Sequence, residues 1–244
     1  YETTCGNYIR GYFNHINPLD KYDLTGTVYH YDIDFDGKEY SLNTYHNIDA
    51  ASASFILLLH RFYKKTGYKN FITQNRKKIA DIAYVIPHLM DDKDGLIRVS
   101  PVSGVKLLEN NSLCYAAMRA YVDMIDEFGW DKKDFYVEAA QDIRTAIQVH
   151  LYRDHRLEFY WKRDQKGKYT PNWKIVYPDR YSQLFPMLYD VLESDTQRKS
   201  FKNRCYRYFD QTWSEADPLR VTVIDLARRK CTADETAASK GETK

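Results

Sequence analysis

The chain has 244 residues, of which 43% are hydrophobic, and this is enough to bury the core of one large domain. Its 36 Lys and Arg residues nearly balance its 34 Asp and Glu residues, so we expect no nucleic-acid partner, because such proteins usually carry a strong basic excess. The longest purely apolar run, residues 55–59, is far shorter than the roughly 20 residues that a bilayer span needs, and we expect no membrane span.

The sequence pattern of the N-terminal part predicts a short helix followed by a β-hairpin. The helix is expected around Tyr8–His15 and ends before Pro18. Residues 27–42 then alternate between apolar and polar side chains on both sides of Asp36-Gly37. An Asp-Gly pair between two alternating runs is typical of a β-hairpin with a tight turn.

An apolar helix is predicted to follow the hairpin and to end at Gly67. Asn47 or Asp49 can cap its start, two lysines lie in its last turn, and a terminal Gly is a common helix stop. Because this helix is apolar nearly all round at its centre, we expect it to be buried.

The rest of the chain predicts further helices and one extended segment. In chain order, helices are expected over about 70–90, 110–129, 131–152, 179–192, 195–212 and 218–230, with an extended hairpin over 157–177. Residues 1–231 are expected to form a single α/α hairpin domain, and residues 232–244 to form a disordered C-terminal tail.

The predicted elements repeat along the chain. Apolar helices begin at about residues 49, 111, 179 and 218, and amphipathic helices alternate with them. Alternation of inner and outer helices is how α/α toroids and solenoids are built. We therefore predict a mainly α fold, an α/α toroid or partial barrel of helical hairpins, with one or two small β-hairpins.

The starts of three predicted inner helices carry acidic side chains, which are Asp49, Glu109 and Asp179. In a toroid the N-termini of the inner helices converge on one mouth, so these carboxyl groups are candidates for one catalytic cleft. Paired carboxyl groups are what glycoside hydrolysis requires, one as proton donor and one as base or nucleophile. We expect Glu109 or Asp179 as the acid and Asp49 as the base. The alternative is that each residue only caps its helix.

Tyrosine is unusually frequent, with 22 residues in a chain that is 15% aromatic. Tyr offers a flat apolar face and a hydroxyl, which suits stacking on sugar rings, although it also fills space between helices. The side chains expected to bind substrate are Tyr45, His46, Tyr115, Trp161, Trp173, Arg180, Tyr181 and Gln183. The seven His residues show no metal-ligand spacing, and no cofactor motif is present, so neither metal nor cofactor is expected.

The layout and short motifs resemble the six-hairpin (α/α)-barrel glycosidases and the related polysaccharide lyases and epimerases. The resemblance covers residues 43–230 and is carried by Asp94-Gly95-Leu96 before Glu109-Asn110-Asn111, and by Tyr177-Pro178-Asp179. It implies a carbohydrate-active enzyme. The chain departs from the family because about seven helices are predicted where a closed barrel has about twelve, so the barrel is incomplete or the chain is part of a longer protein.

The leading functional hypothesis is a glycoside hydrolase that cleaves a poly- or oligosaccharide with paired carboxylates. The alternative is a non-catalytic helical-repeat module that binds glycan or protein through its concave face. A polysaccharide lyase is third, with Tyr45 and His46 as the groups that would move the proton. The chain begins with Tyr1 rather than Met, which leaves open whether an N-terminal leader has been removed. We expect an extracellular or cell-surface location, with a cytoplasmic one as the alternative.

Overall fold

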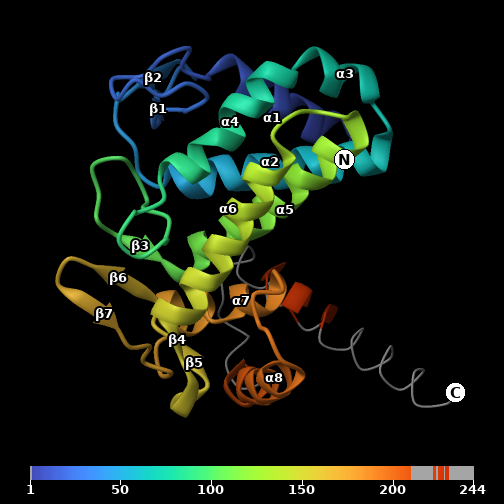
Figure 1. Cartoon of the computed structure of the whole chain (residues 1–244). Helices are drawn as coiled ribbons and strands as arrows, with labels where there is room; N and C mark the ends of the chain where they lie inside the picture. The colour runs from blue at the N-terminus through green and yellow to red at the C-terminus, as the bar shows by residue number, and fades with distance from the viewer. Residues whose placement is uncertain (1, 210–221, 224, 228, 231–244) are drawn as a thin grey trace, which may run out of the picture.

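The computed structural model describes residues 2–209, 222–223, 225–227 and 229–230 (Figure 1). Its helices are α1 (Glu2–Asn14), α2 (Ile48–Thr66), α3 (Lys69–Gln74), α4 (Arg76–His88), α5 (Leu108–Phe128), α6 (Lys133–Ala146), α7 (Leu184–Leu188) and α8 (Asp195–Phe209). Its strands are β1 (Tyr31–Ile33), β2 (Glu39–Ser41), β3 (Lys106–Leu107), β4 (Tyr152–Arg153), β5 (Glu158–Phe159), β6 (Lys162–Asp164) and β7 (Gly167–Tyr169). Short helical turns cover Ile147–Leu151, Asp154–Arg156 and Val176–Arg180.

The predicted mainly α architecture of helical hairpins is confirmed within the described residues. α2 packs against α4, α5 against α6, and α7 against α8, and these three pairs follow one another along the chain. The first helix of each pair also packs against the next first helix, α2 on α5 and α5 on α7 (Figure 1). The described part is therefore a partial toroid with α5 at its centre. None of its helices is long and apolar enough to cross a membrane.

α2 and α5 run parallel, with their starts at the same end. At that end, the Asn110 side chain donates a hydrogen bond to Asp49 over 3.1 Å. At the other end, the Tyr63 hydroxyl donates to Glu127 over 2.6 Å, and Lys64 forms an ion pair with the same carboxylate. The side-chain contacts at both ends fix the register of the two helices, so the acidic residues of their first turns are brought together.

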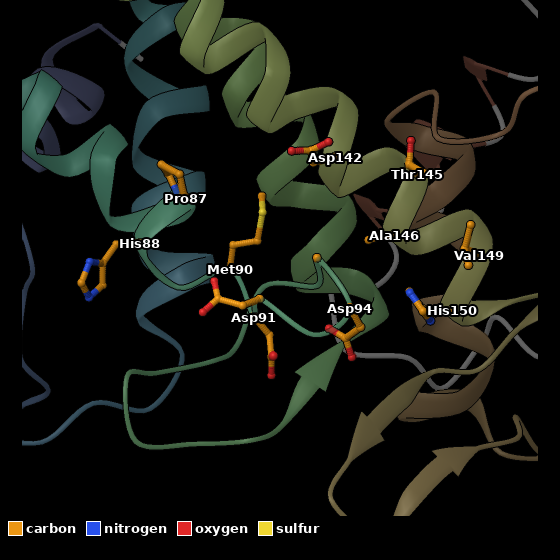
Figure 2. A pocket seen from close by; sticks show the side chains of 12 residues that line it. Pro87, His88, Met90, Asp91, Asp94, Asp142, Thr145, Ala146, Val149 and His150 are labelled. Carbon is orange, nitrogen blue, oxygen red and sulfur yellow. The ribbon is translucent and has the colours of Figure 1, made fainter.

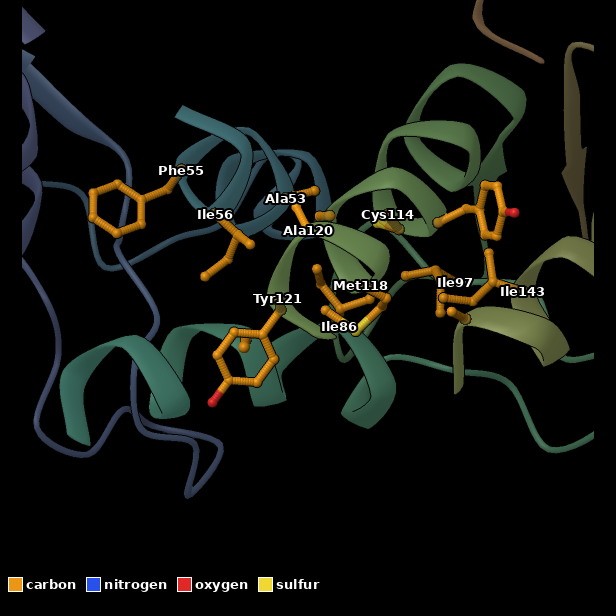
Figure 3. Packing of buried hydrophobic residues seen from close by; sticks show 14 of the residues in the cluster. Ala53, Phe55, Ile56, Ile86, Ile97, Cys114, Met118, Ala120, Tyr121 and Ile143 are labelled. Atoms are coloured by element: carbon orange, nitrogen blue, oxygen red, sulfur yellow. The ribbon is translucent and has the colours of Figure 1, made fainter. Parts of the chain in front are cut away.

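Small side chains let α2 and α5 approach closely. Ala53 and Ala120 are buried where the two helices meet, and larger side chains such as Ile56 and Met118 fill the space around them (Figure 3). Ile86 of α4 is also fully buried in this cluster. Close packing of this kind makes burial of apolar surface the main stabilising contribution of the hairpin layers.

Three small antiparallel sheets accompany the helices. β1 pairs with β2 with Asp32 opposite Tyr40, which confirms the predicted N-terminal β-hairpin and its turn at Gly37. β6 pairs with β7 on one edge and with β3 on the other, and β4 pairs with β5. The extended hairpin expected over 157–177 is thus confirmed only in part, because its strands are short and end at Tyr169.

Several helix boundaries differ from the sequence expectation. The segment 70–90 forms two helices rather than one, and they meet at Asn75, whose side chain donates to the Phe71 carbonyl over 2.8 Å. Such local bonds compete with helix continuation. α6 continues after Ala146 as a π-helical turn over Ile147–Leu151, so the chain is helical almost to the expected end at about residue 152, with a change of helix type. The helix expected from residue 179 begins with the helical turn over Val176–Arg180 and, after a break at Gln183, continues as α7 from Leu184.

The two ends of the chain also differ in part from expectation. α1 begins at Glu2, well before the expected start at Tyr8. The helix expected over 195–212 is described to Phe209. Of the helix expected over 218–230, only residues 222–223, 225–227 and 229–230 are described, and they are helical. The proposed tail, 232–244, lies outside the described residues, and the single-domain boundary at 231 stays a prediction.

The loop between α4 and α5, residues 89–107, holds the starts of α2 and α5 in place. The buried Asn111 side chain accepts from the Ile97 backbone N–H over 2.7 Å and donates to the Ile97 carbonyl over 3.0 Å. The backbone N–H of Ile48, at the start of α2, donates to the Val99 carbonyl over 3.1 Å. One loop therefore contacts both helix starts.

We predict that Gly26→Ala destabilises the fold strongly, whereas Gly37→Ala does so only mildly. Both glycines have φ of +79°, but a Cβ at Gly26 would lie 2.4 Å from the backbone of Asp81 on α4, and a Cβ at Gly37 would meet no atom within 4 Å. Urea unfolding should show a loss of about 3 kcal/mol or more for Gly26→Ala and about 1 kcal/mol for Gly37→Ala. Equal losses would contradict the close packing of this loop on α4.

Candidate functional site

Asp49 and Glu109 form an acid pair at the starts of α2 and α5. Asp49 is fully buried in the first turn of α2, and its Oδ1 accepts the bond from Asn110 over 3.1 Å. Its Oδ2 is also buried and makes no hydrogen bond to any described residue. Asn47, expected as a possible cap, makes no side-chain capping bond, and its Oδ1 lies 3.5 Å from the Asn110 amide instead.

The surroundings of Asp49 favour its protonated form. Burial is the largest cause, and it raises the pKa of Asp49 to about 7, while the negative charge of Glu109 acts in the same direction. The Asn110 amide and the backbone N–H of Ala50 lower this pKa but do not offset the burial. Near neutral pH the pair therefore retains a proton that two separate carboxylates would have lost.

Glu109 is the more accessible member of the acid pair, since it is only partly buried. It lies in the first turn of α5, where the positive end of the helix dipole favours a negative charge. The backbone N–H of Leu108 donates to the Trp161 carbonyl over 3.0 Å, so Trp161 lies beside the start of α5. The structure thus brings Asp49, Glu109 and Trp161 together.

Asp179 bonds to a different segment. Its Oδ1 accepts from the backbone N–H of Asn172 over 2.6 Å, and its side chain is 6% exposed. Gln183 is fully buried and pairs with both the N–H and the carbonyl of Phe159, over 2.8 and 3.0 Å. Arg180 donates to the Tyr208 carbonyl over 2.6 Å. These contacts join the start of α7 to neighbouring segments.

Tyr45 and His46 lie in the segment that leads to α2 and contact other N-terminal residues. The Tyr45 hydroxyl donates to Asp20 and also bonds the Thr27 hydroxyl, and burial raises its pKa well above the ordinary value. The ring of His46 stacks on His30 with 4.2 Å between ring centroids. Tyr45 is therefore held as a neutral hydroxyl.

The remaining expected sugar-binding residues are spread over several elements. Tyr115 is buried on α5, with the Arg119 guanidinium 5.6 Å from its ring. Tyr181 is 8% exposed and packs against Phe185 of α7. Trp173 is partly exposed, as is Trp161. Of these side chains, Trp161 is the one whose backbone bonds the first turn of α5.

Trp173 belongs to a cluster around Glu158 that the sequence did not indicate. Glu158 is 4% exposed, and it accepts from the Trp173 ring N–H over 2.8 Å and from Arg153 over 2.5 Å. Arg204 of α8 adds an ion pair at 3.4 Å and lies 4.8 Å from the Trp173 ring. The only sequence signal was the place of Glu158 in an otherwise apolar run. A charge buried with several partners is held rigidly.

A second missed cluster surrounds Asp94 in the loop 89–107. Lys106 is buried and contacts both Asp94 oxygens, over 2.8 and 2.7 Å, and Asp91 over 2.8 Å, while Arg163 reaches Asp94 over 3.0 Å. A cavity of about 580 Å³ opens beside it, with Asp91 and Asp94 on one side and residues of α6 and its π-helical turn, among them His150, on the other (Figure 2). None of the three expected catalytic acids lines this cavity.

The chemistry of these clusters is that of hydrogen bonding and proton transfer. Within the part of the chain that the structure describes, no group of three His, Cys, Asp or Glu residues is arranged to hold a metal ion. Asp49 keeps unsatisfied hydrogen-bonding capacity, because one of its buried carboxyl oxygens has no hydrogen-bond partner among the described residues.

Comparison with known proteins supports the fold. No protein-family model matches the sequence, and no curated protein matches it. The structure is similar to a rhamnosidase from Klebsiella oxytoca with rhamnose bound, with a TM-score of 0.62 and 10% identity over 88% of this chain and 40% of that one. It is also similar to a GH78 family rhamnosidase of Bacillus sp. GL1, with a TM-score of 0.55 and 13% identity over 78% of this chain and 21% of that one.

At these identities the likeness shows a shared fold. The chain spans less than half the length of either rhamnosidase.

We predict that Asp49→Asn removes a pH-dependent component of stability. Because folding raises the pKa of Asp49 from about 3.9 to about 7, its contribution is fully present below pH 4 and is lost as pH rises to 7. The introduced amide does not ionise. The difference in unfolding free energy, variant minus wild type, should therefore increase between pH 4 and 7 by up to about 4 kcal/mol. Urea unfolding at several pH values measures this.

Asp126→Asn, at an exposed position of α5 where the carboxylate pairs with Lys133, is the matched control and should follow the wild-type pH curve. Parallel curves for Asp49→Asn and the wild type would contradict a raised pKa at Asp49.

Proposed function

We propose that the chain is a carbohydrate-active enzyme, a glycoside hydrolase acting on a poly- or oligosaccharide, with its chemistry at the acid pair of Asp49 and Glu109. The observation that carries this proposal is the buried Asp49 carboxyl, whose pKa is raised to about 7 beside a second, more accessible carboxyl. Carboxyl groups held partly protonated near neutral pH are what proton donation to a glycosidic oxygen requires. The fold shared with two rhamnosidases supports the choice of substrate class.

The two carboxyl groups have different roles in this proposal. Glu109 is partly exposed and is the group that meets the substrate and donates the proton to the leaving oxygen. Asp49 is fully buried and acts as a positioning residue, whose charge acts on the neighbouring Glu109 carboxyl. This differs from the sequence hypothesis, in which Asp49 is the base, because Asp49 is fully buried and has no contact with solvent.

Hydrolysis needs a further carboxyl group to activate water or to attack the sugar. We propose Asp179 for that role, although the sequence hypothesis considered it as an alternative acid. Trp161 is partly exposed, and its backbone carbonyl accepts from Leu108 at the start of α5. Aromatic faces of this kind suit stacking on a pyranose ring. We propose an extracellular or cell-surface location, in keeping with a polymeric substrate.

A non-catalytic glycan-binding module is the second candidate, and the burial of both Asp49 and Asp179 favours it. A lyase is less well supported. The Tyr45 hydroxyl is engaged by Asp20 and Thr27, and its pKa is raised, which makes it a poor proton acceptor.

We predict that Glu109→Gln lowers turnover by about a hundredfold or more, since loss of a general acid has effects of that size. The assay is release of nitrophenol from a panel of aryl glycosides, α-L-rhamnoside included, and of reducing ends from polysaccharides. Asp49→Asn should lower turnover less and should remove the change in rate near pH 7 that ionisation of Asp49 causes, because the introduced amide does not ionise.

Asp126→Asn serves again as the control on α5 and should keep wild-type rates. Saturable glycan binding without turnover in the wild type would favour the binding module. Products that absorb in the near ultraviolet would favour the lyase. Full activity of Glu109→Gln would exclude the acid pair as the catalytic site.

A further inference from the structure

A cavity of about 350 Å³ lies between α4, the C-terminal half of α5 and the start of α6. We call this cavity the Tyr121 pocket. The lining residues used in the argument are Arg76, Asp81, Tyr84, Tyr121, Trp130 and Tyr136. Tyr121 follows Glu109 by 12 residues on the same helix. At the rise of an α-helix this separates the pocket from the acid pair by about 18 Å. The two sites share no residue.

Two buried tyrosines place unused hydroxyl groups in the Tyr121 pocket. Tyr121 is 3% exposed and Tyr136 is 4% exposed, and their rings meet edge to face at 4.7 Å. Neither hydroxyl makes a hydrogen bond with another described residue. In Figure 3 the Tyr121 hydroxyl points away from Ile86 and Met118, on the side opposite the apolar core. Both residues are largely buried and line the pocket, so their hydroxyls are available to a ligand with polar groups.

The protonation state of both hydroxyls suits hydrogen bonding to sugar hydroxyls. Burial is the main reason that the pKa of Tyr136 is raised to about 12, and it raises the pKa of Tyr121 as well. Both groups therefore keep their protons at physiological pH, and each can donate one hydrogen bond and accept others.

Aromatic rings at the rim provide an apolar face beside these hydroxyls. Tyr84 lines the pocket and is 45% exposed, and Phe135, 43% exposed, lies beside it with 6.4 Å between ring centroids. An exposed ring next to buried hydroxyls matches a sugar, which has an apolar C–H face and a polar edge. The volume lies near the lower end of the range of about 300–1,000 Å³ for small-molecule sites, which suits one or two sugar rings.

The charges around the pocket balance one another. Arg76 pairs with Asp131 over 2.8 Å, and Asp81 pairs with Lys77 over 2.7 Å. The Arg76 guanidinium also lies 5.8 Å from the Trp130 ring, where it occupies the position that a cationic ligand would take in an aromatic cage. A neutral ligand is therefore favoured over an anion or a quaternary ammonium ion.

We propose that the Tyr121 pocket binds a neutral mono- or disaccharide unit, with the hydroxyls of Tyr121 and Tyr136 bonded to the sugar and its apolar face against Tyr84. This is a glycan-binding site separate from the acid pair, and it would hold a chain of sugars on the enzyme away from the reacting bond. The inference does not require that the acid pair be catalytic.

The test is calorimetric titration and saturation-transfer NMR with maltose, cellobiose and L-rhamnose on the full chain. We expect saturable binding of at least one probe by the wild type. Tyr121→Phe/Tyr136→Phe keeps both rings and removes both hydroxyls, so it should fold and bind about tenfold more weakly. Tyr84→Ala, at an exposed position, should weaken binding without loss of stability. Tyr8→Phe, on α1 and 58% exposed, is the control and should bind as the wild type does.

Repeating the titrations with Glu109→Gln separates this proposal from the catalytic one. Binding that persists in Glu109→Gln and is lost in Tyr121→Phe/Tyr136→Phe supports the pocket, whether or not turnover is ever seen. The proposal is overturned if no probe binds, if the double variant binds as tightly as the wild type, or if binding is lost in Glu109→Gln alone. Tighter binding of tetramethylammonium than of any of the three sugars would also overturn the proposal.

Discussion

The parallel packing of α2 against α5 is the constraint on which the rest of the structure depends. The Asp49–Asn110 contact at one end and the Tyr63–Glu127 contact at the other fix the register of the two helices. Because both helices start at the same end, their first turns present two carboxyl groups to one region where both helix dipoles are positive. Burial of Asp49 at this convergence is the main reason for its raised pKa, and the charge of Glu109 adds to it.

The loop between α4 and α5 makes that convergence possible. Asn111 binds both backbone groups of Ile97, so the loop is attached to α5, and its Val99 carbonyl receives the first N–H of α2. Lys106 anchors the same loop through Asp91 and Asp94. Buried polar groups that satisfy one another hold a single arrangement, which is what a site at helix starts requires.

α5 connects two regions of different character. Its start carries Glu109 and lies beside Trp161, whereas its C-terminal half contributes Tyr121 to a pocket of buried hydroxyls and exposed rings. In the two proposals, one helix carries a reacting site and a separate glycan-binding site about 18 Å apart, a spacing set by its rise. A polymeric ligand could contact both, while a monosaccharide could contact only one.

The sequence by itself determined the fold class, the first β-hairpin and the starts and ends of α2 and α5, because hydrophobic period, Asp-Gly and terminal glycines are local signals. It also pointed to Asp49 and Glu109 through their shared place at helix starts. The tertiary structure alone decided that these two meet while Asp179 bonds Asn172 instead. It alone assembled Glu158 with Trp173 and Arg204, and Tyr121 with Tyr136. These partners come from separate elements, and sequence spacing does not encode which elements pack together or how deeply a side chain is buried.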